Sequence, residues 1–474
     1  MKIFINNSRS KVEFENEKEK EWIFDRLSLV DVQAEKAAQN GYYVEDTRIR
    51  LFNKITQRFP TGLLFDLRKW AQSDGVRIEE IDQRKIDSEA LDCASLDMLG
   101  MVGKYAFQAE ALKAWSTGPM PWRGVIKSPT GSGKGRIAVG AAKATRGHTL
   151  FLVHRGHLAD DVASRWGELC PEEPQAGKIG AGVWSQGDRL TCATVQTLHR
   201  NRGSEKFADL VRSVDGIILD ECHTAPADSV REVLQACEGA RRRLGLSGTP
   251  YDRADKRSLI STAILGPLCF SISAGELIDA GVIEPPQVYI VPCTQVDPKI
   301  IGNWSATYRK HIVRSKKRNK IVMECVKKAY SDGKTPGIIF TRQIAHAKEL
   351  LKMAHKEGFN VEIVDGAKSS ATRKNAIESI KRGDLDFIIS TKVFAEGVDI
   401  PEIQSVINAA AGKAVIDVLQ QIGRGTRRSK GKSGVDVYEI GDKGDPVLHK
   451  HAKARVRAAQ REGYACKVLD LGGN

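Results

Sequence analysis

The chain has 474 residues, of which 41% are hydrophobic and 28% are charged, and this composition excludes disordered and fibrous proteins. No apolar run approaches the roughly 18 residues that are needed to cross a bilayer, so we expect no membrane partner. The 73 basic and 59 acidic side chains give a net charge of +14, which favours a polyanionic partner, with a solvated basic surface as the alternative.

The nine cysteines are scattered along the chain and form no Cys-x-x-Cys pair. This spacing argues against structural zinc and against a disulfide framework, and it favours a reducing compartment. The first residues, MKIFINNSRSKVEF, turn polar too early for a signal peptide. We therefore expect a cytoplasmic protein.

Residues 1–95 have the pattern of a small α+β module without a catalytic signature. The segments TRIRLF and VRIEEID alternate between apolar and polar residues, which predicts strands at 47–52 and 76–82. EKEKEWIFDRLSLV predicts a helix over 17–30, and PTGLLFDLRKWAQSDG predicts a second helix that ends at Gly75.

Residues 96–282 and 283–442 each alternate short apolar runs with helical stretches, and 443–474 hold a basic helix and a tail. Continuous apolar runs between helices indicate strands that are buried on both faces of a parallel sheet. The fold class predicted is therefore α/β, with two such domains in tandem. The expected strands of the first domain are GVIK, TLFLVH, LTCATVQ, GIILDE and RLGLSG, and those of the second are GIIFT, NVEIVDG, DFIIST, SVINAA and VDVYEIG.

The segment SPTGSGKGR, residues 128–136, lies between the strand GVIK and the helix GRIAVGAAKAT and has the pattern of a phosphate-binding loop. Its glycines let backbone N–H groups surround phosphate oxygens at a helix N-terminus, and its lysine reaches the β- and γ-phosphates. The alternative is an accidental Gly/Ser-rich turn. The predicted ATP-binding residues here are Thr130, Gly131, Ser132, Gly133, Lys134, Gly135 and Arg136.

Gly135 stands where this pattern has Ser or Thr, whose hydroxyl binds Mg²⁺. Mg²⁺ usually keeps several waters, so a water can take the vacant position with some loss of affinity. We expect an active ATPase with a weakened or altered Mg²⁺ dependence. The alternative is a protein that binds nucleic acid without turning over ATP.

The segment GIILDECHTA places Asp220 and Glu221 at the carboxyl end of an apolar strand. Phosphoryl transfer needs a carboxylate that holds Mg²⁺, here Asp220 acting largely through water, and a group that orients and deprotonates the attacking water, here Glu221. Glu221 is also a predicted member of the Mg²⁺ site, again largely through water. The alternative is an ordinary acidic strand end.

The letters DECH at 220–223, together with SPTGSGKG, resemble superfamily 2 helicases. The resemblance implies two tandem RecA-like domains, at 96–282 and 283–442, with ATP and Mg²⁺ as cofactors. It also implies that Gln108 in YAFQAEAL reads the adenine edge, although Tyr105 stands where the family has an arginine.

Further segments match motifs of the same superfamily in order along the chain. In LGLSGTPY, Ser247 and Thr249 are implied to couple the ATP state to domain movement, together with His223. The residues implied to contact the nucleic-acid backbone are Arg155, Gln196 and Thr197 in the first domain and Thr341, Arg342 and Thr391 in the second.

The second domain also contributes residues that the resemblance places at the nucleotide. In STKVFAEGVDIP these are Gly397 and Asp399, and in QQIGRGTRR they are Gln420, Arg424 and Arg427. The two arginines are implied to reach the γ-phosphate as arginine fingers. A solvated basic helix end is the alternative, since RRSKGKSG continues the charge.

Within the superfamily the whole chain resembles branch-migration helicases of the UvsW type, through FPTGLLFDL, the linker NWSATYRKHIVRSKKRNKIV and the C-terminal REGY. The resemblance implies that residues 1–95 bind duplex or branched DNA; a packing cap on the first motor domain is the alternative. It also implies that the cytoplasm is that of a bacterial or phage-infected cell. The run SKKRNK, residues 315–320, is either a solvated helix face or a contact to DNA.

We therefore expect an ATP-dependent DNA helicase or translocase that remodels branched or duplex DNA in recombination and repair, by branch migration or by fork or R-loop remodelling. Its expected partner is branched, duplex or single-stranded DNA. We expect it to act as a monomer, with other recombination or repair proteins as further partners. Two alternatives stay open: the motor subunit of a restriction or repair complex, and a nucleic-acid clamp or RNA remodeller with weak ATPase activity.

Overall fold

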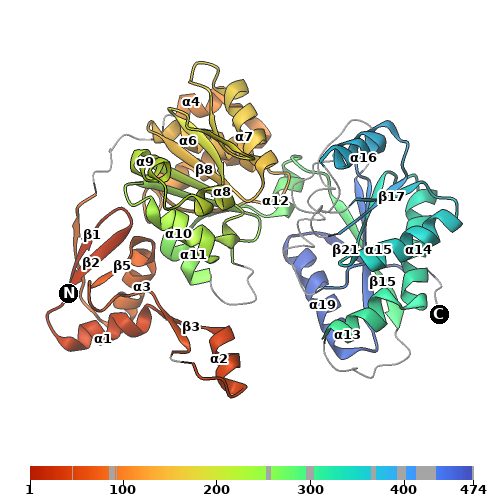
Figure 1. Ribbon diagram of the computed structural model, residues 1–474, viewed down its shortest axis with the longest axis horizontal. Helices are drawn as coiled ribbons and strands as arrows, with labels where there is room; N and C mark the ends of the chain where they lie inside the picture. The colour runs from red at the N-terminus through yellow and green to blue at the C-terminus, as the bar shows by residue number, and fades with distance from the viewer. Residues whose placement is uncertain are drawn as a thin grey trace. The chain divides into compact units, whose positions relative to one another are not determined.

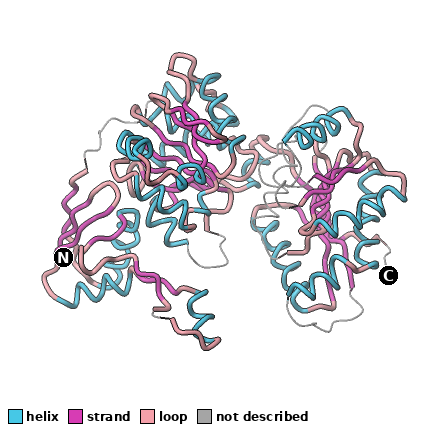
Figure 2. The backbone as a smooth tube through the Cα atoms, viewed as in Figure 1, coloured by secondary structure: helices cyan, strands magenta, loops and turns pink. Residues whose placement is uncertain are grey.

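The computed structural model describes residues 1–44, 46–84, 91, 93–251, 258–294, 304–364, 370–391, 402–412 and 434–471. The chain divides into two compact units, Met1–Ser128 with Gly133–Ile272 and Pro129–Ser132 with Ser273–Asn474. In both units strands form a central sheet with helices on its faces, as Figure 2 shows in magenta and cyan. The predicted α/β class with parallel sheets is confirmed. No helix in the described part of the chain is long and apolar enough to cross a membrane.

The N-terminal module is a four-stranded sheet in the order β5-β2-β1-β6, with two helices packed on it (Figure 1). Its apolar core joins alternate residues of the strands, such as Ile3 and Val12, to Ile23 and Leu67 of the helices. The bounds are β1 Lys2–Ile5, β2 Arg9–Glu13, β5 Arg58–Pro60, β6 Glu79–Asp82, α1 Glu17–Arg26 and α3 Leu64–Asp74, with a 3₁₀ turn η1 at Thr61–Leu63.

One expectation in this module is wrong. The helix predicted over 17–30 ends at Arg26, and Ser28–Val30 forms strand β3, which pairs with β4, Arg48–Arg50. The Ser28 hydroxyl donates to the carbonyl of Phe24, 2.5 Å away, at the end of α1. Helix α2, Val32–Gln39, lies between these two strands in the sequence.

The larger sheet of the first unit has the order β10-β9-β11-β8-β12-β13-β7-β14 and is parallel except for β10. Each face is covered by its own apolar cluster, one against α5, α6 and α7 and the other against α8 to α11. Burial of both faces is why the strands read as continuous apolar runs. The strands are β7 Arg123–Lys127, β8 Thr149–Val153, β9 Gly177–Gly180, β10 Val183–Ser185, β11 Leu190–Thr194, β12 Gly216–Asp220, β13 Arg242–Ser247 and β14 Leu268–Ser271.

The helices of this α/β domain connect successive strands and bring their carboxyl ends to one edge of the sheet. Their bounds are α4 Cys93–Met98, α5 Ala106–Thr117, α6 Lys134–Thr145, α7 Gly156–Leu169, α8 Val195–Arg200, α9 Glu205–Ser213, α10 Asp228–Ala236 and α11 Ser258–Leu265, with the 3₁₀ turns η2 Gly103–Tyr105 and η3 Cys222–Thr224. Residues that follow β7, β8, β11, β12 and β13 therefore meet at that edge.

The N-terminal module packs directly on the first α/β domain. Met120 and Ala263 of that domain belong to the apolar core of the module. A Cβ atom on Gly62 would lie 2.1 Å from the carbonyl oxygen of Thr262, so only glycine fits this contact. The Arg68 guanidinium also donates to the carbonyl of Pro119 at 3.3 Å. These contacts support the alternative role of residues 1–95, which is to pack against the first motor domain.

The second unit contains a seven-stranded parallel sheet in the order β17-β18-β16-β19-β20-β15-β21. Helices α14 and α15 share one apolar cluster with its strands. The strands are β15 Pro286–Thr294, β16 Gly337–Phe340, β17 Val361–Val364, β18 Phe387–Ser390, β19 Ser405–Asn408, β20 Val435–Lys443 and β21 Ala465–Val468. The helices are α12 Ala274–Asp279, α13 Trp304–Tyr308, the π-helix η4 Arg309–Val313, α14 Lys316–Ser331, α15 Ile344–Lys356, α16 Ser370–Arg382 and α19 Pro446–Arg461.

The basic run SKKRNK is not a uniformly solvated face. Ser315 is the N-cap of α14, and its hydroxyl accepts the backbone N–H of Arg318. The side chains of Arg318 and Asn319 are buried inside the second unit. Two members of the run are therefore structural, and only its lysines stay available to solvent or to a polyanion.

Candidate active site

The phosphate-loop segment connects β7 to α6, as expected. Gly131 and Gly133 have φ values of +91° and +84°, in the left-handed region that favours glycine. A Cβ on Gly133 would lie 2.5 Å from Nε2 of the buried Gln108, so this glycine also permits a close approach by α5. The loop thus ends at the positive N-terminal end of α6, where the helix dipole favours an anion.

Lys134 is the first residue of α6, and its ammonium group donates to the carbonyl of Ser128 at 3.3 Å. Arg136, two residues further, donates to the carbonyl of Gly100, and its guanidinium lies 5.3 Å from the centre of the Tyr105 ring. Tyr105 therefore has an arginine beside it in space, although the family's arginine is missing from its own position.

Gly135 lies in the first turn of α6 next to α7. A Cβ added there would lie 3.3 Å from Cδ and from Nε of Arg165. The Arg165 side chain is long and exposed, so it has room to move aside by the few tenths of an ångström that a side chain at 135 requires. The glycine is therefore not imposed by a rigid neighbour.

Asp220 and Glu221 follow each other at the carboxyl end of β12. Burial, and then the neighbouring charge of Glu221, raise the pKa of Asp220 to about 6, against the opposing effect of Lys134. Glu221 has a φ of +50°, and its backbone N–H donates to Oδ1 of Asp220 at 3.0 Å. The two carboxylates are thus held in fixed relation by a strained turn.

The chemistry of these residues fits Mg²⁺ bound together with a nucleotide. Among the residues that the structure describes, no three His, Cys, Asp or Glu side chains form a group that could hold a metal ion. Mg²⁺ needs few protein ligands because it keeps several waters, and one buried carboxylate at Asp220 suits it. The hydroxyls of Ser128 and Thr249 are buried without a hydrogen-bond partner in the described parts of the chain, which suits a phosphate-bearing ligand.

The predicted coupling residues meet around the carboxylate of Glu221. Its Oε2 atom lies 3.3 Å from Nδ1 of His223 and 3.4 Å from the hydroxyl of Ser247, which donates to it. The same hydroxyl accepts the backbone N–H of Thr249 at 3.2 Å. The carbonyl of Ser247 accepts the N–H of Ser128 at 3.0 Å, which ties the end of β13 to the start of the phosphate loop.

The residues predicted to contact nucleic acid in the first unit lie at the same edge of the sheet. Arg155 is the N-cap of α7, and Gln196 and Thr197 lie in the first turns of α8. Gln196 is exposed, and the hydroxyl of Thr197 is hydrogen-bonded to that of Thr194 at 2.8 Å. Their roles in binding stay predictions.

Two residues at this edge were not predicted from the sequence. His154 follows β8 directly, and its Nε2 lies 2.8 Å from the hydroxyl of Thr224 in η3. Its Nδ1 lies 3.2 Å from the amide nitrogen of Gln196. Both residues lie within segments quoted above, TLFLVH and GIILDECHTA. Their contact forms only because the strands that precede them, β8 and β12, pair side by side.

In the second unit, Thr341 and Thr391 follow the adjacent parallel strands β16 and β18. The N–H of Thr341 donates to the carbonyl of Ser390 at 2.8 Å, and both threonines are buried. Arg342 is exposed beside them. The predicted residues Gly397, Asp399, Gln420, Arg424 and Arg427 lie outside the described residues.

Two family models match the chain in order. Residues 103–252 match the res subunit of type III restriction enzymes, and residues 317–429 match the helicase conserved C-terminal domain. The chain is also similar to a fragment of a putative HsdR subunit of a type I restriction enzyme from Vibrio vulnificus. That match has a TM-score of 0.56 and 18% identity, and it covers 91% of this chain and 77% of the other.

Two curated relatives extend the comparison over most of the length. Putative helicase 22 of a Sulfolobus islandicus filamentous virus is 26% identical over 69% of this chain, and the chain spans 62% of that relative. UvsW of phage T4 is 23% identical over 84% of this chain and 82% of its own length. With the two family models in order along the sequence, these similarities show that the chain is a superfamily 2 helicase that resembles UvsW.

Proposed function

We propose that this protein is an ATP-driven motor that moves on DNA and remodels branched or duplex DNA. The observation that carries the proposal is the meeting of Lys134, Asp220 and Glu221 at one edge of a parallel sheet, with His223 and Ser247 on the carboxylate of Glu221. These are the groups that phosphoryl transfer to water requires.

Each residue has a distinct part in the proposed hydrolysis. Lys134 binds the β- and γ-phosphates, and Gln108 contacts the adenine base. Asp220 holds Mg²⁺, which when bound neutralises charge on the phosphates. Glu221 orients the attacking water and takes its proton. Gln420, Arg424 and Arg427 keep their predicted place at the γ-phosphate, with Gly397 and Asp399 at the nucleotide.

The choice of DNA rests on charge and on the relatives. UvsW is named an ATP-dependent DNA helicase, and the chain matches most of its length. The net charge of +14 suits a nucleic-acid backbone. The proposal assigns 96–282 and 283–442 to the two motor domains, 1–95 to a DNA-contacting module, and 443–474 to a C-terminal helical tail. Branch migration, a repair role and a cytoplasmic location belong to the same proposal.

A second candidate is the motor subunit of a restriction complex. The match of residues 103–252 to the res subunit, together with the fold similarity to HsdR, favours it. In this case DNA cleavage requires a partner chain. Co-purification of a nuclease with the protein would support this second candidate.

The experiment that tests the proposal is steady-state ATPase with Mg²⁺. Turnover is compared without nucleic acid and with single-stranded DNA, duplex DNA, a four-way DNA junction and RNA of matched length. We expect the junction to stimulate turnover most, and Glu221→Gln to lower it by roughly 100-fold or more, as loss of a general base does. Stimulation by RNA alone would contradict the choice of DNA. Tight DNA binding without turnover would identify a clamp.

Gly135 gives a sharper test of the Mg²⁺ site. Because Arg165 can move aside, we expect Gly135→Thr to fold and to reach half-maximal turnover at a several-fold lower Mg²⁺ concentration. Gly135→Ala is the matched control, since it adds the Cβ atom without the hydroxyl. If the Thr and Ala variants show the same Mg²⁺ dependence, position 135 is not at the metal.

A further inference from the structure

A chain of three hydrogen bonds joins Gln196 to the peptide of Glu221. The amide nitrogen of Gln196 lies 3.2 Å from Nδ1 of His154, and Nε2 of His154 lies 2.8 Å from the hydroxyl of Thr224. That hydroxyl donates to the carbonyl of Glu221 at 2.9 Å. The chain therefore crosses from α8 through the end of β8 to the turn that follows β12.

The chemistry of the donors fixes the direction of every link. The Thr224 hydroxyl has one proton, which it gives to the carbonyl of Glu221, so it must accept from Nε2 of His154. The imidazole is then neutral with its proton on Nε2, and Nδ1 accepts an N–H of Gln196. All three donors thus point from Gln196 toward Glu221.

The far end of this chain holds a strained residue. Glu221 is left-handed at φ +50°, a conformation that costs free energy for a residue with a side chain. The hydroxyl and the backbone N–H of Thr224 both donate to its carbonyl, at 2.9 and 3.0 Å. His223 and Ser247 contact its carboxylate separately. The peptide and the carboxylate of Glu221 are therefore held by different side chains.

The near end is open to a ligand. Gln196 is exposed on α8, and its amide carries two N–H groups, one of which His154 uses. The second can donate to a phosphate oxygen of a nucleic-acid strand, a contact that glutamine commonly makes. A bound strand would then fix the amide and, through it, the imidazole and the Thr224 hydroxyl.

We propose that His154 and Thr224 are positioning residues that transmit the binding of a nucleic-acid strand at Gln196 to the backbone of Glu221. The inference rests on the proposed function, since it explains how a strand stimulates ATP turnover. In this proposal neither residue acts directly on the nucleotide or on the attacking water. Loss of the link should therefore lower stimulated turnover and leave basal turnover unchanged.

The test uses one isosteric and one conservative variant of the full chain. Thr224→Val keeps the side-chain shape and removes the hydroxyl, whereas Thr224→Ser keeps the hydroxyl. We expect Thr224→Val to lower the kcat of DNA-stimulated ATPase by about fivefold to tenfold, which corresponds to the loss of a net hydrogen bond. Basal kcat, the KM for ATP and the Kd for single-stranded DNA should stay as in the wild type, and Thr224→Ser should restore stimulation.

The chain offers a matched control in the same sheet. The hydroxyl of Thr191 in β11 lies 2.8 Å from Nε2 of His148, the same distance as in the link from His154 to Thr224. His148 precedes β8 and His154 follows it, so the two links lie at opposite edges of the sheet. Thr191→Val should leave stimulation unchanged.

The outcomes separate this inference from the proposed function. If the wild-type protein has no ATPase activity, both the proposed function and this inference are wrong. Stimulated wild-type turnover with an equally stimulated Thr224→Val variant would contradict the inference alone. Equal loss of basal and stimulated turnover in Thr224→Val would show a purely structural role and would also overturn it.

Discussion

Among the residues that the structure describes, four arginines are at most 2% exposed, two in each unit, and the two units satisfy them in different ways. In the first unit, Arg243 donates to the carbonyls of Leu234, Cys237 and Ala240. Arg123 donates to backbone carbonyls as well, one of them in the N-terminal module. Burial lowers the pKa of Arg243 to about 10, so it stays charged at neutral pH and is balanced by peptide dipoles.

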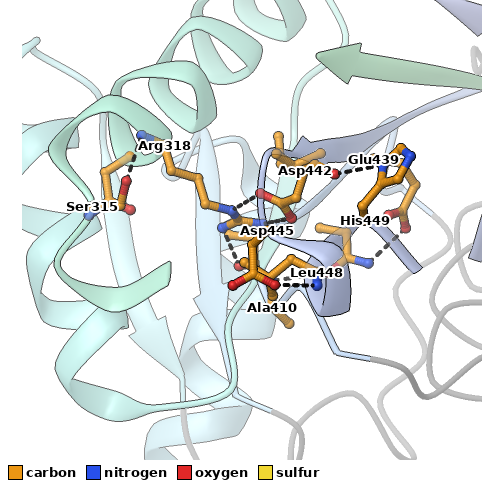
Figure 3. Close-up of polar contacts among 12 residues, drawn as sticks. Ser315, Arg318, Ala410, Glu439, Asp442, Asp445, Leu448 and His449 are labelled. Carbon is orange, nitrogen blue, oxygen red and sulfur yellow. Dashed lines mark hydrogen bonds and ion pairs between the residues drawn. The ribbon is translucent and has the colours of Figure 1, made fainter. Parts of the chain in front are cut away.

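In the second unit the buried arginines pair with carboxylates. Arg318 contacts both oxygens of Asp442, at 2.9 and 3.3 Å, and Figure 3 shows the two side chains facing each other between α14 and β20. Burial acts against the charge of Arg318, but Asp442 raises its pKa above the ordinary value. Arg455 pairs with Glu439 at 2.8 Å.

The difference concerns what remains when the arginine is removed. A carbonyl that loses a donor is a neutral acceptor, and a water can replace the donor. A carboxylate that loses its partner inside the protein is a bare charge in a medium of low dielectric constant. The second unit should therefore depend on its buried arginines more steeply than the first.

The largest effect is expected for Arg318→Met. The substitution leaves Asp442 fully buried and unpaired, which should lower the free energy of unfolding of the second unit by about 3–5 kcal/mol. Hydrogen exchange of the β20 amides measures this unit separately. The double variant Arg318→Met with Asp442→Asn is the control and should recover part of the loss. A loss below about 1 kcal/mol would show that the pair behaves like a surface ion pair.

A smaller effect is expected for Arg243→Met. The change leaves three carbonyl acceptors near Leu234, Cys237 and Ala240 without their donor, at a cost of about 1–3 kcal/mol to the free energy of unfolding. Hydrogen exchange of the β13 amides provides the measurement. A loss as large as that of Arg318→Met would remove the distinction between the two units.

The smallest effect concerns pH. Burial, and then the charge of Arg318, lower the pKa of His346 from 6.5 to about 3. Between these values only the unfolded chain binds the proton, so stability falls as the pH falls below 6.5. At pH 5.5 the loss should be about 1 kcal/mol in the free energy of unfolding. In urea unfolding at pH 7.5 and 5.5, His346→Gln should reduce the difference in the free energy of unfolding between the two pH values. An unchanged difference would show that another group causes the pH dependence.

The parallel sheets and the phosphate loop could be predicted from the sequence because they depend on local pattern. Continuous apolar runs mark strands with two buried faces, and the glycines at 131 and 133 supply the left-handed backbone that the loop needs. The acids of DECH follow an apolar strand, so their place at the sheet edge follows from the strand itself.

Other features depend on partners that are distant in sequence. Nothing near Arg318 reveals that it pairs with Asp442, 124 residues later, so the charge run by itself predicts a solvated face or a contact to DNA. His154 and Thr224 are 70 residues apart and meet only because β8 and β12 pair in parallel. The helix predicted through residue 30 stops early because Ser28–Val30 pairs with a strand that begins at Arg48.

The contact at Gly62 has a consequence for protein engineering. Its α-carbon faces the carbonyl oxygens of Thr262 and Ala263, with no space for a side chain. A chimaera that joins the N-terminal module to another motor would carry η1 without the matching helix α11. Such grafts should therefore transfer η1 and α11 together, so that the close packing of Gly62 against Thr262 and Ala263 is kept.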